Sequence, residues 1–174
     1  MYTTTPRLFP GKRLLIATTA LLACWSAGSV AGEQQPPTFR MMAIENLAGG
    51  DLVTEGRYAE AIEKITARRV SASDFAAHNN LCVAYVKTKA LDKAAAACEA
   101  AIELRSRDAD PGYLHSAVVR QKLRDRAIAL SNRGVLRAIT GDVTGARDDF
   151  EKSAKLADDI DEPLINLDRL SAGL

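Results

Sequence analysis

The feature that most constrains the fold is an internal similarity between three segments of the chain. Each segment has a small residue, a turn seven residues later and an alanine five residues after the turn. The alanines are Ala61, Ala94 and Ala146, so the two intervals between them are 33 and 52 residues. A spacing of this size is typical of repeat proteins, in which each unit is a supersecondary element that stacks on the next. The small residue, turn and alanine are Gly49, Gly56 and Ala61, then Cys82, Lys89 and Ala94, then Gly134, Gly141 and Ala146.

The repeating unit is expected to be a pair of helices. The stretches EGRYAEAIEKI, KALDKAAAACEAAI and TGDVTGARDDFEKSAKL each begin at a turn and continue with small or apolar residues three and four positions apart. Alanine is abundant and aromatic residues make up only 5% of the chain, which suits closely packed helices better than sheets. One hairpin leaves its apolar face in water, so the hairpins must stack. The sequence predicts an all-α fold.

The three segments resemble the tetratricopeptide repeat, which has a period of about 34 residues and the pattern W-x2-L-G-x2-Y followed by A-x3-F. The second segment matches best, although Cys82 and Cys98 take the places of the glycine and the aromatic, and His78 that of the tryptophan. The resemblance implies a short right-handed solenoid of three such hairpins. Matching residues are Leu81, Tyr85, Ala94 and Ala101 in the second segment, Leu130, Gly134, Ala146 and Phe150 in the third, and Gly49, Leu52, Ala61 and Ile65 in the first.

The resemblance also sets the expected boundaries. The helical domain is expected over residues 39–172, after a flexible lead-in at 32–38, with a capping helix at 161–172 that covers the last hairpin. The extra segment, 108–126, accounts for the longer second interval and is read as an extension of the next helix; its basic cluster is read as a solvated face rather than an anion site. The three repeats are expected at about 42–70, 75–106 and 127–157.

The first residues indicate export. Arg7, Lys12 and Arg13 precede an uncharged run from Leu14 to Trp25, and Ser29-Val30-Ala31 has the small-x-small pattern of a cleavage site. The run is 12 residues long, whereas a membrane-spanning helix needs about 20. We therefore expect a secretory signal peptide at 1–31 and a bacterial protein that is periplasmic or secreted. Cleavage leaves 20 basic and 22 acidic residues, which gives no electrostatic reason to bind nucleic acid.

An alternative lies inside the same segment. Leu21-Leu22-Ala23-Cys24 resembles the box of a bacterial lipoprotein, in which the cysteine becomes the lipidated first residue. In that case the protein would be a membrane-anchored structural component of an envelope assembly. Contact with a membrane is expected only if Cys24 is lipidated.

The two remaining cysteines, Cys82 and Cys98, lie on either side of the turn near Lys89. At about 1.5 Å rise per residue their distances from that turn are roughly 10 and 13 Å, so the two thiols are nearly level. An exported chain permits oxidation, and a structural disulfide is the preferred interpretation. The alternative is two reduced cysteines that fill the core as small apolar residues. Neither His78 nor His115 has metal-ligand spacing to them, so no zinc site is expected.

No catalytic site, metal site or cofactor is expected, because the sequence has no G-x-S-x-G, no H-E-x-x-H and no phosphate-binding glycine loop. What the resemblance implies is a concave groove, lined by the first helix of each hairpin, that receives a peptide or helix of an unidentified protein partner. Self-association of the solenoid is also possible. The carboxylate clamp of some family members is not expected, because Asn80 alone matches it, with Asn132 at another of its positions. By position, the groove would present Asn46, Asn79, Val83, Val86, Lys87, Ser131 and Val135.

Overall fold

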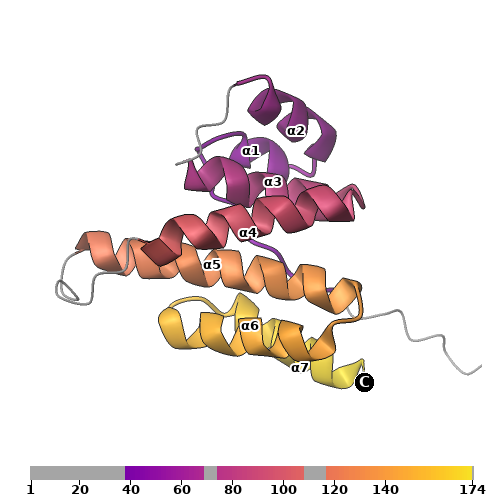
Figure 1. Ribbon diagram of the computed structural model, residues 1–174, viewed down its shortest axis with the longest axis vertical. Helices are drawn as coiled ribbons and strands as arrows, with labels where there is room; N and C mark the ends of the chain where they lie inside the picture. Colours follow the sequence, from indigo (N-terminus) through magenta and orange to yellow (C-terminus); the bar gives the residue numbers. More distant parts are fainter. Residues whose placement is uncertain (1–37, 69–73, 108–116, 174) are drawn as a thin grey trace, which may run out of the picture. The chain divides into compact units, whose positions relative to one another are not determined.

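The structure is a computed structural model and describes residues 38–68, 74–107 and 117–173. They belong to one compact unit, Gln35–Leu174; a first unit, Met1–Gln34, lies outside the described residues. The predicted signal peptide, its cleavage site and Cys24 therefore lie outside them too. The described part is all-α and holds seven helices (Figure 1): α1 Gly50–Thr54, α2 Tyr58–Thr66, α3 Phe75–Lys87, α4 Leu91–Arg107, α5 Ala117–Ile139, α6 Val143–Leu156 and α7 Glu162–Ala172.

Successive helices pack against one another as antiparallel hairpins; in Figure 1, α3 to α7 follow one another down the view, with α1 and α2 above them. The α3–α4 hairpin turns at Lys89 (φ 61°) and the α5–α6 hairpin at Gly141 (φ 88°), both in the left-handed region that ends a right-handed helix. Asp74 and Asp142 cap α3 and α6, because each side chain accepts a hydrogen bond from the backbone N–H three residues on. The predicted turns are thus the observed ones.

The α5–α6 contact depends on a missing side chain. A Cβ on Gly134 of α5 would lie 2.6 Å from Cε1 of Phe150 on α6, so only glycine allows the ring to lie against the helix. Phe150 is fully buried, as are Ala61, Ala94, Ala101 and Ala146, the alanines at the recurring positions. Small residues at these contacts let the paired helices approach closely.

The first repeat differs from the expected one. Residues 42–49 are not helical, and the first helix of this repeat, α1, spans only five residues. Asn46 (φ 58°), Ala48 (φ 43°) and Gly49 (φ 73°) have left-handed backbone angles, which a right-handed helix cannot contain. Asn46, expected on a helix in the groove, instead lies exposed in this turn.

The extra segment is helical where the structure describes it. Residues 117–126 extend α5 toward its N-terminus, as expected, and 108–116 lie outside the described residues. Asp125 is buried there and accepts hydrogen bonds from Arg105 of α4 (2.9 Å) and from Gln121 (2.8 Å). Arg124, one of the basic cluster, donates to Asp159 at 2.9 Å. These contacts tie the extension to α4 and to the loop before α7.

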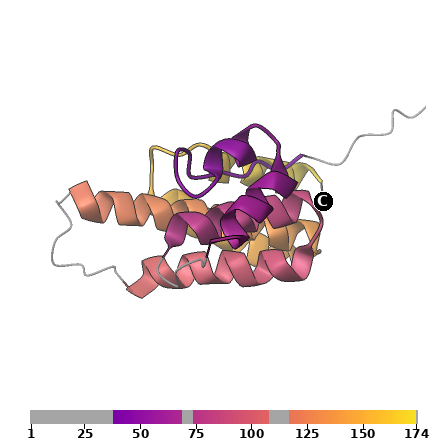
Figure 2. The same cartoon turned by 90° about the horizontal axis from the view of Figure 1, so that it is seen from above.

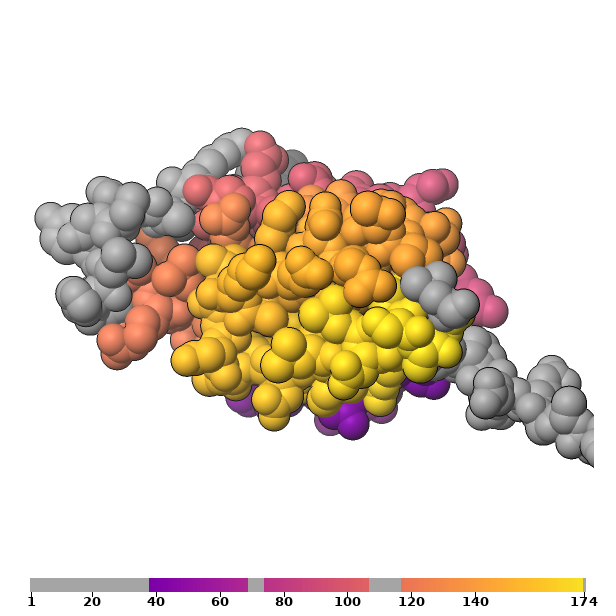
Figure 3. All heavy atoms as spheres, turned by 90° about the horizontal axis from the view of Figure 1, so that it is seen from below, coloured from indigo at the N-terminus to yellow at the C-terminus, as the bar shows by residue number. Residues whose placement is uncertain are grey.

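Helix α7 ends the described part and packs on α6 and α5. Figure 3 shows α6 and α7 side by side on one face of the molecule. Leu170 and Asn166 of α7 are buried, and Leu170 lies in a cluster with Val135 and Phe150. Among the described residues, no helix has the length and apolar character that crossing a bilayer requires.

Candidate functional site

The residues before α1 form an extended segment, which we call the strap (residues 38–44). It lies across α3, α5 and α7, and Figure 2 shows it as the indigo trace that leads into α1. Three buried asparagines, one on each of these helices, hold its backbone. Together they form what we call the asparagine face: Asn80 on α3, Asn132 on α5 and Asn166 on α7.

Each of these asparagines binds both backbone groups of one strap residue. Asn166 Oδ1 accepts from the N–H of Arg40 at 2.8 Å, and its Nδ2 donates to the carbonyl of Arg40 at 2.8 Å. Asn132 binds Met42 in the same way, at 2.9 and 2.8 Å. Asn80 binds Ile44, at 2.8 and 3.1 Å. A side-chain amide has one acceptor oxygen and one donor NH2, so it can pair with a residue in a strand as a second strand would.

The bonded residues alternate along the strap, and this alternation shows that the strap is extended. In a strand, the N–H and C=O of one residue point to the same side, and those of the next residue point to the opposite side. Arg40, Met42 and Ile44 therefore face the asparagines together. Two residues of strand rise span roughly 7 Å, so the stacked helices must present their asparagines at a similar interval.

A fourth asparagine completes the network. Asn79 of α3 is fully buried, donates to the carbonyl of Met42 at 3.0 Å and accepts from Asn132 Nδ2 at 2.9 Å. Asn80 also donates to the carbonyls of Leu47 (2.9 Å) and Ala48 (3.3 Å), so it holds the turn after the strap as well. Buried amides satisfied in this way rigidify a structure, whereas each lost partner leaves an unpaired polar group that costs about 1–3 kcal/mol.

The strap also packs its side chains against the helices. Phe39 stacks on Phe150, with ring centroids 6.3 Å apart. Met41 packs against clusters that contain Val86, Val83 and Val135. The face that receives the strap therefore combines side-chain amides, which bind its backbone, with apolar side chains, which pack against its side chains.

Most of the predicted groove residues lie on this face. Asn79 binds the strap, Val83, Val86 and Val135 are buried in clusters that include strap residues, and Lys87 is exposed at the end of α3. Ser131 is fully buried, and its Oγ has no hydrogen-bond partner among the described residues. Asn46 does not join them, because its backbone lies in the turn after the strap.

The strap was not expected from the sequence, and of the four asparagines that bind it only Asn79 was expected in the groove. Asn166 follows Asn132 by 34 residues, the repeat period, and Asn132 follows Asn80 by 52 residues, the interval that also separates Ala94 from Ala146. This recurrence of asparagine at one repeat position was the available signal. It also indicates that α7, expected as a cap, takes the position of the first helix of a further repeat.

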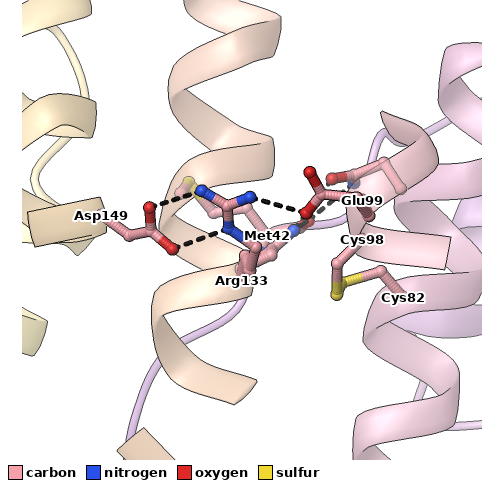
Figure 4. Close-up of a disulfide and its surroundings, with 8 residues drawn as sticks. Met42, Cys82, Cys98, Glu99, Arg133 and Asp149 are labelled. Carbon is pink, nitrogen blue, oxygen red and sulfur yellow. Dashed lines mark hydrogen bonds and ion pairs between the residues drawn. A yellow bond between two sulfur atoms is a disulfide. The ribbon is translucent and has the colours of Figure 1, made fainter. Parts of the chain in front are cut away.

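The structure joins Cys82 of α3 to Cys98 of α4 by a disulfide, with a Cα–Cα distance of 4.9 Å (Figure 4). Both cysteines are buried in the cluster that also holds Leu81 and Ala94. The bond links the two helices of the second hairpin. Its role here is structural, since neither sulfur is exposed.

A charged cluster joins α4, α5 and α6 and shares only α5 with the asparagine face. Asp149 of α6 is fully buried and accepts from Arg133 at 2.8 Å and from Arg137 at 2.9 Å. Arg133 reaches Glu99 of α4 as well, at 2.6 Å (Figure 4). The hydrogen bond that Arg133 donates to Asp149 raises the pKa of the Arg133 guanidinium above its ordinary value. The cluster joins α4, α5 and α6, and its charges are paired with one another.

No group of three or more potential metal ligands lies together in the part of the chain that the structure describes. A family model described as tetratricopeptide repeat matches residues 47–113. No curated protein and no solved structure matches the chain. The matched stretch contains α1 to α4, and the α5–α6 hairpin after it repeats the same architecture.

Proposed function

Because residues 47–113 match the tetratricopeptide-repeat family, we propose that the protein is an exported, non-catalytic protein–protein interaction module that binds an extended segment of a partner protein at the face that carries the strap. The repeats of this family generally mediate protein–protein interactions. The observation that carries the proposal is the strap itself. It is a peptide segment that this face holds through its backbone.

Binding through the backbone bears on what the face can recognise. The asparagines contact only N–H and C=O groups of the strap, which every non-proline residue carries. Selectivity must then come from the partner's side chains, which would contact the apolar residues around the strap, such as Val86 and Val135. A face of this kind suits a partner that presents a short extended segment.

Export is supported by the disulfide and by the N-terminal pattern. Disulfides persist in oxidising compartments and are rare in the reducing cytosol. Removal of residues 1–31 would take away Cys24 and leave Cys82 and Cys98, which are the bonded pair. These features support the proposal that the protein is periplasmic or secreted, with signal cleavage after Ala31.

The experiment that tests the interaction is site-specific photocrosslinking in the cells that make the protein. A photoreactive side chain at position 87 lies beside the strap, and one at position 152, on α6, is the control; both native lysines are exposed. We expect discrete products with a second protein from position 87 and none from position 152. The same products from both positions, or none from position 87, would contradict the proposal.

A further inference from the structure

The strap has a second edge that the asparagines leave unused. Since the backbone groups of Arg40, Met42 and Ile44 face the asparagines, those of Phe39, Met41 and Ala43 point to the opposite side. None of the described residues makes a hydrogen bond to the N–H or C=O groups of these three residues. An unpaired strand edge of this kind is a template for pairing with another chain.

Open space borders this edge. A cavity of about 670 Å3 lies between Phe39 and Met41 of the strap and the C-terminal parts of α3 and α5. Its lining is mostly apolar and includes Val86, Val135, Ala138 and Ile139, and the Ile139 side chain is 47% exposed. A second cavity, of about 380 Å3, reaches Ala43 and shares Phe39, Met41 and Lys87 with the first. Together the two cavities are lined by Phe39, Met41 and Ala43, the three residues of the free edge.

The charges around this space have mostly one sign. Lys87 and Lys89 line the larger cavity, and Arg40 and Lys87 line the smaller one, in which Glu162 is the acidic residue. An added segment that carried acidic residues would meet these cations. A second copy of the strap would instead bring its own Arg40 toward these cations, and like charges repel. The charge pattern favours an acidic partner segment over self-pairing.

Displacement of the strap is a less favourable route for an incoming segment. The strap donates three hydrogen bonds to the asparagines and accepts four from them. A competitor would have to replace all of these and the packing of Phe39 on Phe150. Pairing with the free edge needs none of them to break.

We propose that the free edge of the strap, at Phe39, Met41 and Ala43, accepts an extended acidic segment of a partner protein as an added β-strand. The backbone of the segment pairs with these three residues, its apolar side chains enter the cavity over Val86, Val135 and Ile139, and its carboxylates lie near Lys87 and Lys89. This is peptide recognition by strand addition, in which backbone bonds supply affinity and pockets for alternate side chains supply selectivity. The inference rests on the proposed interaction function and names the class of its ligand.

The test uses the exported chain and a synthetic peptide of about nine residues, the length of an ordinary strand, in which valine and glutamate alternate. Amide exchange is followed by NMR. We expect the peptide to slow exchange at Phe39, Met41 and Ala43 by about tenfold or more and to leave Arg40, Met42 and Ile44 protected. A peptide of alternating valine and lysine should bind about tenfold more weakly, and raised salt should weaken the glutamate peptide.

Two pairs of variants locate the site. Ala43→Pro removes one free-edge N–H without touching the asparagine bonds, and it should weaken the peptide about fivefold, whereas Ala43→Val keeps the N–H and should not. Lys87→Glu reverses a rim charge and should also weaken it about fivefold, whereas Lys152→Glu on α6 should not. The lysine pair keeps the test valid if the proline variant is poorly folded.

Four outcomes would overturn the inference. They are no binding of the glutamate peptide at about 1 mM, equal affinity for both peptides, loss of protection at Arg40, Met42 and Ile44, and slow exchange at the free edge that depends on protein concentration alone. The third would mean that peptides displace the strap, and the fourth that a second copy occupies the edge. Crosslinks from position 87 together with any of these results would leave the interaction function standing and remove strand addition.

Discussion

Asn132 on α5 binds both backbone groups of Met42, 90 residues earlier in the chain: its Oδ1 accepts from the N–H at 2.9 Å and its Nδ2 donates to the carbonyl at 2.8 Å. The same amide donates to Asn79 Oδ1 at 2.9 Å, and the Asn132 residue is fully buried. The Asn132–Met42 pair is the middle one of the three asparagine–backbone pairs that hold the strap.

Asn132→Asp should destabilise the protein strongly although it hardly changes the side chain's size. The carboxylate would keep the bond from the Met42 N–H but would turn an oxygen toward the Met42 carbonyl and Asn79 Oδ1, where Nδ2 now donates. Two buried hydrogen bonds become oxygen–oxygen contacts, so we expect a loss of about 3 kcal/mol in the free energy of unfolding. Denaturant titration measures it. Asn46→Asp, at an exposed asparagine, is the control and should change stability by less than about 1 kcal/mol.

Amide exchange in the free protein should alternate along the strap. The N–H groups of Arg40, Met42 and Ile44 are bonded to asparagines, whereas those of Phe39, Met41 and Ala43 have no partner among the described residues. We expect the first set to exchange at least about a hundredfold more slowly by NMR, since protection requires the strap to open. Equal protection of both sets would mean that the strap is not held by its alternate residues.

Asp149→Asn should destabilise the molecule by about 3 kcal/mol, because removing one charge of a buried pair leaves its partners uncompensated. Asp149 is fully buried between Arg133 and Arg137. The matched control is Glu99→Gln, which removes the other partner of Arg133, but from a side chain that is 62% exposed. We expect less than about 1 kcal/mol there. Similar losses at both positions, measured by denaturant unfolding, would contradict this account.

The Arg124–Asp159 pair predicts a pH effect at the loop before α7. The hydrogen bond from Arg124 lowers the pKa of the Asp159 carboxyl. A carboxyl with a lowered folded-state pKa stabilises the fold above its unfolded pKa, and this contribution is lost as the pH falls through the folded value. Arg124→Gln should therefore return the pKa of Asp159 to its ordinary range in an NMR titration. An unchanged titration would show that the pair does not form in solution.

Intact mass tests export and the disulfide together. Protein purified from its host should begin at Gly32, and reduction should raise its mass by two hydrogen atoms, because Cys82 and Cys98 are bonded. A mass that begins at a lipidated Cys24 would instead place the protein at a membrane.

The double variant Cys82→Ala with Cys98→Ala should lose about 3 kcal/mol of stability on the loop-entropy account. Equal stability of the variant and the oxidised protein would contradict that estimate.

The local pattern of the sequence determined the helical hairpins. The turns at Lys89 and Gly141 and the inward alanines follow from backbone geometry and helical spacing. Cys82 and Cys98 could be paired because they lie at nearly equal distances from one turn. Each of these inferences joins residues that are close in sequence, where the geometry of a helix fixes distances.

The tertiary structure alone decided what residues 38–49 do and what the asparagines are for. Residues 42–49 were expected to belong to a helical repeat, but the hydrogen bonds that a helix would make go to Asn80 and Asn132, 36 and 90 residues away. A side-chain amide has no preferred partner that the sequence can reveal, since its role depends on which backbone the stacked helices bring within about 3 Å. The sequence determined the helices; their stacking determined the amide network that binds an extended chain.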